Sequence, residues 1–361
     1  MTKVFLSPGR IVLGQGVLND LGDYAKAYAE KALLLAHPDD RIRVGKILNG
    51  SAERSGVIFT DAKFQGECTA FEADRIKREY GDGFGCIIGL GGGKALDTAK
   101  IIADDLNLPM ISVPTIASND APCSSLAIIY DENHVVTEGR QLKRNPATVL
   151  IDTEVISKAP ERFLVAGMGD AFSTYFEARA CVRANVKNNG GLSTLSAFNL
   201  AKLCYDTLLA DGEAALIACR ENTVTPALTN IIETNIVMSG LGFESVGVAA
   251  AHGLLGPLEI LGADKALHGE IVAFGTLVLL VMENAPKEEI ITALDFYRKV
   301  GLPATLSGLG ITEFSKEEIL KAAELACEPN ALIHNMPFEV TPESVCAAIL
   351  CANKLESVYG A

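Results

Sequence analysis

Two of the five histidines stand beside glycines in apolar segments, where an imidazole could do chemistry. His252 lies in AAAHGLLG and His268 in KALHGEIVAFG. Two imidazoles with one carboxylate are a common catalytic zinc set that leaves a position for water or substrate, and Asp170 in GMGDAFSTYFEAR would be that carboxylate. The spacing forms no short motif such as H-E-x-x-H. On these residues alone, two structural histidines and an aspartate near a helix start are the favoured alternative.

A glycine-rich turn is the densest local signal, with four glycines within five residues of CIIGLGGGKALDTAK. A buried strand that runs through such a turn into a helix makes an anion site. Glycine lets a diphosphate approach the backbone, and the helix start offers free N–H groups and its positive dipole end. The spacing is neither G-x-G-x-x-G nor a Walker A sequence. A tight turn without a ligand, with Lys94 and Asp97 as surface residues, is the alternative.

Small and hydroxyl side chains follow the next apolar run, in SVPTIASNDAPCSS. Thr115, Ser118 and Ser124 offer hydroxyls and Asp120 a carboxylate at the carboxyl end of a predicted strand. Open α/β sheets bind ligands at that end. A solvated turn is the alternative, since Ser, Asn, Asp and Pro are the usual turn residues.

Two kinds of element must position these groups. Short β-rich runs at 31–37, 56–64, 86–90, 110–115 and 148–152 alternate with helical patterns, which indicates βαβ units and a parallel sheet. After Pro160 the segments become long, Ala-rich and amphipathic, which predicts helices, with a loop at 187–191. We therefore predict an α/β domain over 1–160 and a helical domain over 161–361.

Composition narrows the class of protein. The chain has 361 residues and a formal charge of −14, and it has no run of Lys or Arg, which argues against nucleic acid as a partner. Nine cysteines without a C-x-x-C pair predict reduced thiols. The start has no signal-peptide stretch, and the apolar run at 271–282 is too short to span a bilayer. These features predict a cytoplasmic protein without membrane contact.

Five sequence blocks in order resemble the glycerol dehydrogenases of the iron-containing, or metal-dependent, polyol dehydrogenase superfamily. The blocks are GLGGGKALDTAK at 89–100, VPTIASNDAPCSSLAIIY at 113–130, GMGDAFSTYFEAR at 167–179, LGFESVGVAAAH at 241–252 and HGEIVAFGTL at 268–277. The resemblance implies an N-terminal dinucleotide-binding domain with a parallel sheet and an all-α C-terminal metal-binding domain, the dehydroquinate synthase-like architecture. It also implies an active site in the cleft between the two domains and a homo-oligomer.

The resemblance implies site residues one by one. Asp170, His252 and His268 stand at the family's metal-ligand positions, and Asp120 where the family contacts the polyol. Iron-binding relatives carry a further histidine where this chain has Thr174, so zinc is preferred and Fe²⁺ stays open. The implied nucleotide-site residues are Gly92, Gly93, Lys94, Asp97, Thr115, Ser118, Ser124, Leu126 and Tyr130.

The chain departs from the family pattern in three places. Leu255 replaces a second histidine of the H-A-x-H-N-G pattern near the substrate, and the stretch from His252 to His268 is slightly shorter than usual. The acidic residue expected to hold the adenosine ribose falls on His37, with Asp39 two residues later. NAD is the expected coenzyme, and NADP becomes possible if neither Asp39 nor Asp40 reaches the ribose.

The resulting functional prediction is oxidation of a secondary hydroxyl of glycerol, or of a related small uncharged diol, to the ketone with NAD. No histidine beyond the ligands offers a base, so proton loss is expected through water or the ribose hydroxyls. A hydroxycarboxylate dehydrogenase, a glycerol-1-phosphate dehydrogenase and a dehydroquinate synthase are alternatives of the same architecture. Sparse basic residues around the ligand segments disfavour charged substrates, and synthases generally have Glu where this chain has Asp170. A non-catalytic nucleotide-binding protein is the alternative of another class.

Overall fold

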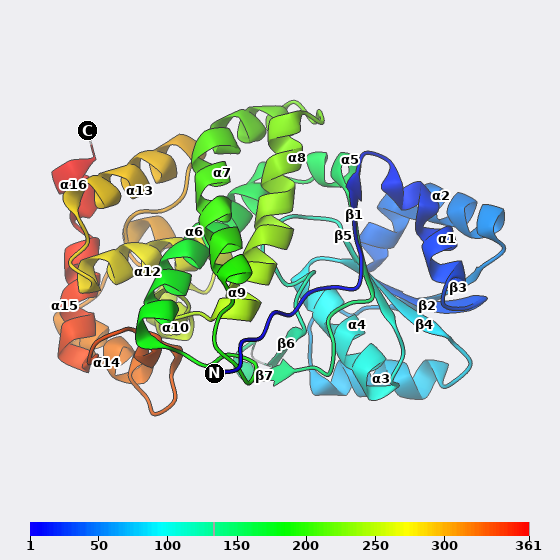
Figure 1. Ribbon diagram of the computed structural model, residues 1–361, viewed down its shortest axis with the longest axis horizontal. Coiled ribbons are helices and arrows are strands. Elements are labelled where there is room, and N and C mark those ends of the chain that lie inside the picture. The colour runs from blue at the N-terminus through cyan, green and yellow to red at the C-terminus, as the bar shows by residue number, and fades with distance from the viewer. Residues whose placement is uncertain (133, 361) are drawn as a thin grey trace. The chain divides into compact units, whose positions relative to one another are not determined.

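Six parallel strands form the main sheet of the chain, whose computed structural model describes residues 1–132 and 134–360 (Figure 1). The strand order is β1-β8-β5-β4-β2-β3. The strands are β1 (Ile11–Gly14), β2 (Lys31–Ala36), β3 (Ile58–Lys63), β4 (Cys86–Gly91), β5 (Met110–Pro114) and β8 (Thr148–Asp152). The parallel sheet predicted from the apolar runs is confirmed. Strand β1 was not among the predicted strands.

The sheet is buried on both faces, as the apolar runs of a parallel sheet require. Alternate residues of β2 show this, because Leu33 and Leu35 belong to one core cluster and Leu34 and Ala36 to the other. The first cluster includes residues of the helices α3 and α4, and the second residues of α1 and α2. These helices are α1 (Leu21–Lys26), α2 (Pro38–Ser55), α3 (Ala70–Tyr80) and α4 (Gly93–Asp105).

A two-stranded antiparallel hairpin, β6 (Leu126–Tyr130) and β7 (Val136–Gln141), packs beside α4. Ala127 and Ile129 are buried, whereas β7 is exposed almost throughout. This hairpin was not predicted from the sequence. The reason is that β7 reads VTEGRQ, which has no apolar alternation to mark a strand.

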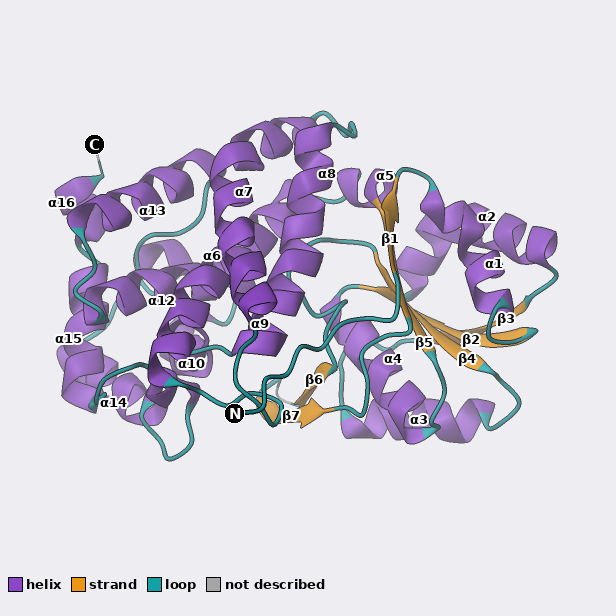
Figure 2. Ribbon diagram, viewed as in Figure 1, coloured by secondary structure: helices purple, strands orange, loops and turns teal. Residues whose placement is uncertain are grey.

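The second half of the chain is helical apart from short bridges and turns, which confirms the prediction for that region (Figure 2). No helix runs between Ala184 and Leu195, where the loop was predicted. The helices are α5 (Thr153–Ser157), α6 (Glu161–Ala184), α7 (Leu195–Arg220), α8 (Pro226–Glu233), α9 (Ser239–Val246), α10 (Ala250–Gly253), α11 (Leu255–Leu258), α12 (His268–Met282), α13 (Lys287–Val300), α14 (Lys316–Ala326), α15 (Pro342–Ala352) and α16 (Leu355–Tyr359).

Contacts divide the chain into two compact units. The first comprises 1–5, 161–216 and 241–361, and the second comprises 6–160 and 217–240. The single boundary at residue 160 predicted from sequence therefore differs from these observed units in two segments. Residues 1–5 join the helical unit through a bridge between Lys3 and Leu192, and 217–240 join the α/β unit through contacts of α8 with α5. These exchanges depend on tertiary packing, which local patterns do not encode.

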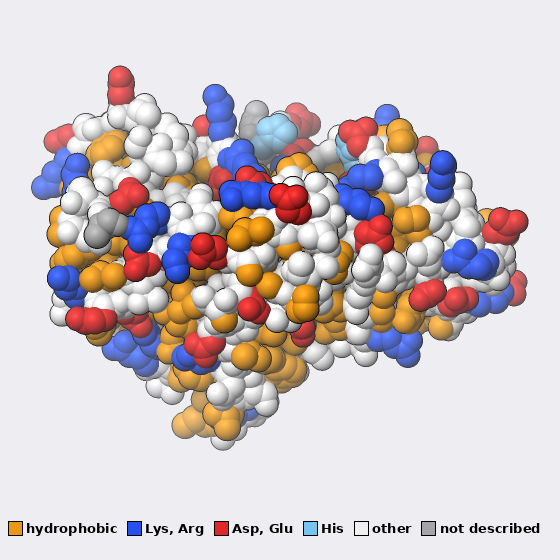
Figure 3. Space-filling model, turned by 90° about the horizontal axis from the view of Figure 1, so that it is seen from above, with side chains coloured by type: hydrophobic (Ala, Val, Ile, Leu, Met, Phe, Trp, Pro, Cys, Tyr) orange, Lys and Arg blue, Asp and Glu red, His pale blue; other side chains and the backbone are white. Residues whose placement is uncertain are grey.

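Charge is dispersed over the face of the molecule drawn in Figure 3. On that face, Lys and Arg side chains are interspersed with Asp and Glu and form no continuous basic patch. Within the described residues, no single helix has the length and apolar composition to cross a membrane; one bent pair, 226–246 with 250–263, passes that test by length and composition only.

Candidate active site

A contact between two glycines brings the predicted metal ligands together in the helical unit. A Cβ on Gly169 of α6 would lie 2.4 Å from the carbonyl oxygen of Gly269, and a Cβ on Gly269 of α12 would lie 1.8 Å from the carbonyl oxygen of Ala166. The two helices can therefore touch backbone to backbone only because both positions lack a side chain. Asp170 follows one glycine and His268 precedes the other, so this contact sets the two ligands side by side.

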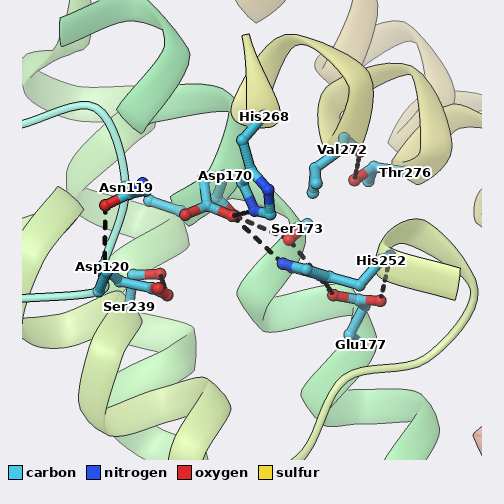
Figure 4. Close-up of polar contacts among 12 residues, drawn as sticks. Asn119, Asp120, Asp170, Ser173, Glu177, Ser239, His252, His268, Val272 and Thr276 are labelled. Atoms are coloured by element: carbon cyan, nitrogen blue, oxygen red, sulfur yellow. Dashed lines mark hydrogen bonds and ion pairs between the residues drawn. The ribbon is translucent and has the colours of Figure 1, made fainter. Parts of the chain in front are cut away.

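His252 reaches the same point from the short helix α10. Its Nε2 lies 3.3 Å from Oδ1 of Asp170, and Nε2 of His268 lies 3.3 Å from the same oxygen. One ligand atom from each of the three residues lies within 4.8 Å of the other two. Figure 4 shows both imidazoles pointing toward the Asp170 carboxylate. The structure thus brings together the three residues predicted as a metal set.

The Asp170 carboxylate fits a cation. It is 1% exposed, and neither oxygen accepts a hydrogen bond within the described part of the chain. Burial raises the pKa of Asp170, but the imidazoles of His268 and His252 outweigh burial and hold that pKa well below its ordinary value. A buried, ionised carboxylate without donors is costly unless a positive charge compensates it. Aspartate and two imidazoles are a donor set that suits Zn²⁺ or Fe²⁺.

Glu177 holds the other side of the His252 ring. It is fully buried, and its Oε2 lies 2.5 Å from Nδ1 of His252. Its Oε1 accepts hydrogen bonds from the backbone N–H groups of Ala249 at 2.7 Å and His252 at 3.0 Å. Burial lowers the pKa of His252, but the carboxylates of Glu177 and Asp170 outweigh burial and raise that pKa well above its ordinary value.

In the α/β unit, the glycine turn lies at the carboxyl edge of the sheet. The register pairs Ala36 with Leu90 and Gly91 with Pro114, so the residues after β2, β4 and β5 follow at one edge. Helix α4 begins at Gly93 without a side-chain cap on its first turn and without an acidic residue there. Uncapped N–H groups at a helix start are an anion site.

Side chains at the two glycines where α4 begins would be tightly packed against the loop after β5. A Cβ on Gly92 would lie 3.1 Å from Cδ1 of Ile116, and one on Gly93 would lie 3.0 Å from the side-chain amide nitrogen of Asn119. The loop after β5 therefore lies directly over the turn. Thr115 at its start is buried, and the Thr115 N–H donates to the carbonyl of Gly91 at 3.1 Å.

Lys94 is the cation at this helix start. Its ammonium pairs with the carboxylate of Glu67 and lies 4.8 Å from the centre of the Tyr130 ring. The same carboxylate lies 3.1 Å from Nδ1 of His134. Two of the predicted nucleotide-site residues, Lys94 and Tyr130, are thus brought together, with a carboxylate that the sequence analysis did not anticipate.

Asp97 is buried and has its partners within the α/β unit. Its Oδ1 lies 2.7 Å from Nζ of Lys100, and its Oδ2 accepts from the N–H of Ile128 at 3.0 Å. Burial raises the pKa of Asp97, and Lys100 opposes that effect. What the structure shows for Asp97 is attachment of β6 to α4. The predicted contact of this residue with a nucleotide stays a prediction.

Lys100 also fixes the loop that precedes β6. Its ammonium donates to the carbonyls of Ala121 at 2.9 Å and Ser124 at 3.3 Å, and to that of Leu126. The predicted nucleotide-site residues Ser124, which is buried, and Leu126, which is partly buried, are therefore placed by a buried cation. Ser118 is partly exposed in the same loop region.

Asp120 belongs to the α/β unit and accepts a hydrogen bond at Oδ2 from the Ser239 hydroxyl at 2.6 Å. Its predicted contact with a polyol stays a prediction.

Known proteins of similar sequence fix the family. The chain is 46% identical to the glycerol dehydrogenase of Citrobacter freundii over 365 residues, which covers 98% of each chain. This chain belongs to the glycerol dehydrogenase family. The sequence model of a family described as "Iron-containing alcohol dehydrogenase" matches residues 8–153. The solved glycerol dehydrogenase of Schizosaccharomyces pombe superposes with a TM-score of 0.96 at 35% identity, over 99% of this chain and 92% of that one. The glycolaldehyde reductase of Halobacterium salinarum is 39% identical over 358 residues, 98% of each chain.

The residues at which this member of the glycerol dehydrogenase family differs from the family pattern lie in helices or at their ends. His37 caps α2, with its Nδ1 3.3 Å from the backbone nitrogen of Asp39, whose N–H it accepts. Leu255 begins α11 in the segment between His252 and His268. Thr174 is buried one turn after Asp170, and a Cβ on Gly242 would lie 2.7 Å from its methyl group.

Three site residues of this family member were missed from sequence. Glu177 stands seven residues after Asp170, two helical turns along the same face, which was a usable signal. Lys100 stands three residues after Asp97, also on one face. Glu67 carried no local signal, because its partner Lys94 is 27 residues away.

Proposed function

We propose that this chain oxidises the secondary hydroxyl of glycerol, or of a related small vicinal diol, to the ketone and transfers the hydride to NAD. The observation that carries the proposal is the buried Asp170 carboxylate, which has no hydrogen-bond donor in the described chain and faces two imidazole nitrogens. The 46% identity to a glycerol dehydrogenase over 98% of both chains supports the choice of substrate class.

Asp170, His252 and His268 would hold the metal ion, with zinc proposed over Fe²⁺. Three protein ligands are the number typical of catalytic zinc sites. Such an ion, when bound, supplies Lewis acidity that lowers the pKa of a substrate hydroxyl. Glu177 keeps His252 oriented toward Asp170, and the glycine contact between α6 and α12 keeps His268 there.

The coenzyme diphosphate would lie on the start of α4, on the N–H groups of Gly93 and Lys94 and beside the Lys94 ammonium. Thr115, Ser118, Ser124, Leu126 and Tyr130 would line the rest of the site, and Lys100 holds part of that lining in place. The adenosine ribose would meet His37, which offers no carboxylate, so the choice of NAD over NADP is a separate part of the proposal.

An uncharged substrate is favoured because basic residues are sparse around the ligand segments, where Lys265 is the nearest candidate cation along the chain. Arg162 is bound by both oxygens of Glu270, at 2.7 Å each, which leaves its guanidinium committed to a carboxylate. A phosphate or carboxylate substrate would need a free cation at this site. Asp120 would accept a hydrogen bond from a further hydroxyl of the diol, and Leu255 would replace a polar neighbour by an apolar one.

Two wider properties are proposed from the sequence and the family. All nine cysteines are free thiols, which supports a reducing compartment such as the cytoplasm. A homo-oligomer is proposed from the family resemblance.

An initial-rate assay tests the proposal. Zinc-loaded protein is given glycerol, 1,2-propanediol, 2-hydroxybutyrate or glycerol 1-phosphate, each with NAD and with NADP, before and after chelation. We expect chelator-sensitive NADH formation with the uncharged diols, and its loss in Asp170→Asn. Turnover only with the acid or the phosphate moves the function to a sister activity. Bound zinc and nucleotide without turnover indicates a non-catalytic protein or a synthase.

A further inference from the structure

The Glu177 carboxylate binds backbone and ring of the same histidine at once. Oε1 accepts from the N–H groups of Ala249 and His252, and Oε2 lies against Nδ1 of His252. The Ser173 hydroxyl adds a longer contact to Oε2 at 3.4 Å. Figure 4 shows Glu177 and Asp170 at opposite nitrogens of the His252 imidazole. The ring is thereby held between two carboxylates of one helix, α6.

These contacts decide which ring nitrogen carries the proton. An ionised carboxylate only accepts hydrogen bonds, so Nδ1 of His252 must donate to Glu177. In the neutral imidazole, Nε2 is then the unprotonated nitrogen, and Nε2 is the atom that lies 3.3 Å from Asp170. We infer that Glu177 is a positioning residue, which fixes the orientation and the Nδ1–H tautomer of His252 so that Nε2 can bind the metal ion. This inference rests on the proposed function.

Charge balance points the same way. Asp170 and Glu177 are 1% and 0% exposed, so two carboxylates are buried around the site. A divalent ion bound at the Nε2 atoms would displace any proton held there, and its two positive charges would compensate the two carboxylates. Buried carboxylates without compensating charge are costly. Glu177 therefore adds to the attraction for a divalent ion without contacting it.

A purely structural role is the competing explanation, because Glu177 also caps the first turn of α10. Glu177→Gln separates the two roles. The Gln carbonyl can still accept from the N–H groups of Ala249 and His252, which keeps the cap. The Gln amide then presents an N–H to Nδ1, which favours the Nε2–H tautomer and directs a proton at the metal position.

Zinc affinity, measured by competition with a chromophoric chelator and without coenzyme, is the first readout. We expect Glu177→Gln to bind Zn²⁺ about 10- to 100-fold more weakly than the wild type, the range for lost partners of metal-binding histidines. Its thermal unfolding should remain cooperative. Glu283→Gln is the matched control, since Glu283 is a buried carboxylate that pairs with Arg179 and Arg183 and contacts no metal-set residue. Its zinc affinity should stay at the wild-type value.

A second readout needs no variant. Long-range ¹H–¹⁵N spectra of the zinc-loaded wild type report the tautomer of His252 directly, and we expect a proton on Nδ1. A proton on Nε2 overturns the inference, and so does a folded Glu177→Gln protein that binds zinc within twofold of the wild type. If the wild type binds no zinc while Nδ1 carries the proton in metal-free protein, the metal part of the proposed function fails and Glu177 is left as an ordinary cap.

Discussion

The buried pair of Lys100 and Asp97 offers the sharpest test of how the α/β unit holds its predicted coenzyme loop. The two side chains are 2% and 8% exposed, and Nζ lies 2.7 Å from Oδ1. Lys100→Met keeps the length of the side chain and removes its ammonium. The carboxylate of Asp97 then stays buried without a cation, and the carbonyls of Ala121, Ser124 and Leu126 lose a donor.

Removing one partner of a buried ion pair costs about 3–5 kcal/mol. For a unit of about 150–250 residues, each kcal/mol lowers the melting temperature by roughly 2–4 °C, so we expect Lys100→Met to melt roughly 10 °C lower. Adding Asp97→Asn to Lys100→Met should restore part of the lost stability, because the asparagine amide carries no charge. Its oxygen can still accept a hydrogen bond from the Ile128 N–H, which lies 3.0 Å from the Asp97 carboxylate in the wild type. The double variant should therefore be more stable than Lys100→Met.

The loss should also depend on pH. Burial raises the pKa of Asp97, and without Lys100 only the hydrogen bond from the Ile128 N–H opposes the rise. A carboxyl group whose pKa is higher in the folded than in the unfolded state costs stability as the pH rises through that range. The deficit of Lys100→Met against the wild type should therefore be smaller at pH 5 than at pH 7.

Circular dichroism melting is measured for the wild type, Lys100→Met, Asp97→Asn and the double variant. This method is chosen because the chain has no tryptophan to serve as a fluorescent probe. If Lys100→Met melts within about 2 °C of the wild type, the ion pair contributes less than about one kcal/mol to the free energy of unfolding, and it is not the support described above. The same conclusion follows if Asp97→Asn destabilises the Lys100→Met protein as much as it destabilises the wild type, because the two residues would then be uncoupled.

Three further predictions concern the predicted metal set and the coenzyme. Gly269→Ala should lower both the melting temperature and the zinc content, because its Cβ would lie 1.8 Å from the carbonyl oxygen of Ala166. Gly256→Ala is the control. It should change neither quantity, because the space around its Cβ is open. Direct NADH fluorescence titration should show Lys94→Met binding about 10- to 100-fold more weakly, the loss of a hydrogen bond from a charged group worth about 1.5–3 kcal/mol. Glu67→Gln should bind NADH up to about fivefold more tightly, because a partly exposed ion pair that competes for Lys94 is worth about 0.2–1 kcal/mol; weaker binding would instead make Glu67 a support for Lys94.

Local pattern accounts for what the sequence predicted well. All five predicted strands form. Four of them, β2, β4, β5 and β8, are apolar runs buried almost throughout, as strands covered on both faces require, whereas the edge strand β3 is apolar only in part. The missed elements lack that pattern. Strand β1 is four residues of intermediate burial at the sheet edge, and β7 is a polar strand. The metal set was found through residue type and family resemblance, since its members lie 82 and 16 residues apart.

What the sequence could not reveal is why the three ligands meet. Neither Gly169 nor Gly269 has a conformational need for glycine, since both lie within regular helices. Their requirement arises only between α6 and α12, where each would place a Cβ against the other helix's backbone. Such a requirement belongs to a pair of distant residues, and a single sequence shows no sign of it. The same holds for Glu67 and Lys94.

Helix α6 is the common support of the site. Gly169 sets the distance to α12, Asp170 faces the two imidazoles, and Glu177, two turns later, holds the ring that comes from α10. A rigid, buried helix with a close backbone contact leaves little freedom to either carboxylate, so the ligand geometry exists before any ion arrives. Such preorganisation reduces the ordering cost of binding. It also places two carboxylates in the core, whose negative charges the proposed divalent cation would compensate. Under the proposed function, the contacts of α6 that stabilise the helical unit are therefore also those that would set its metal affinity.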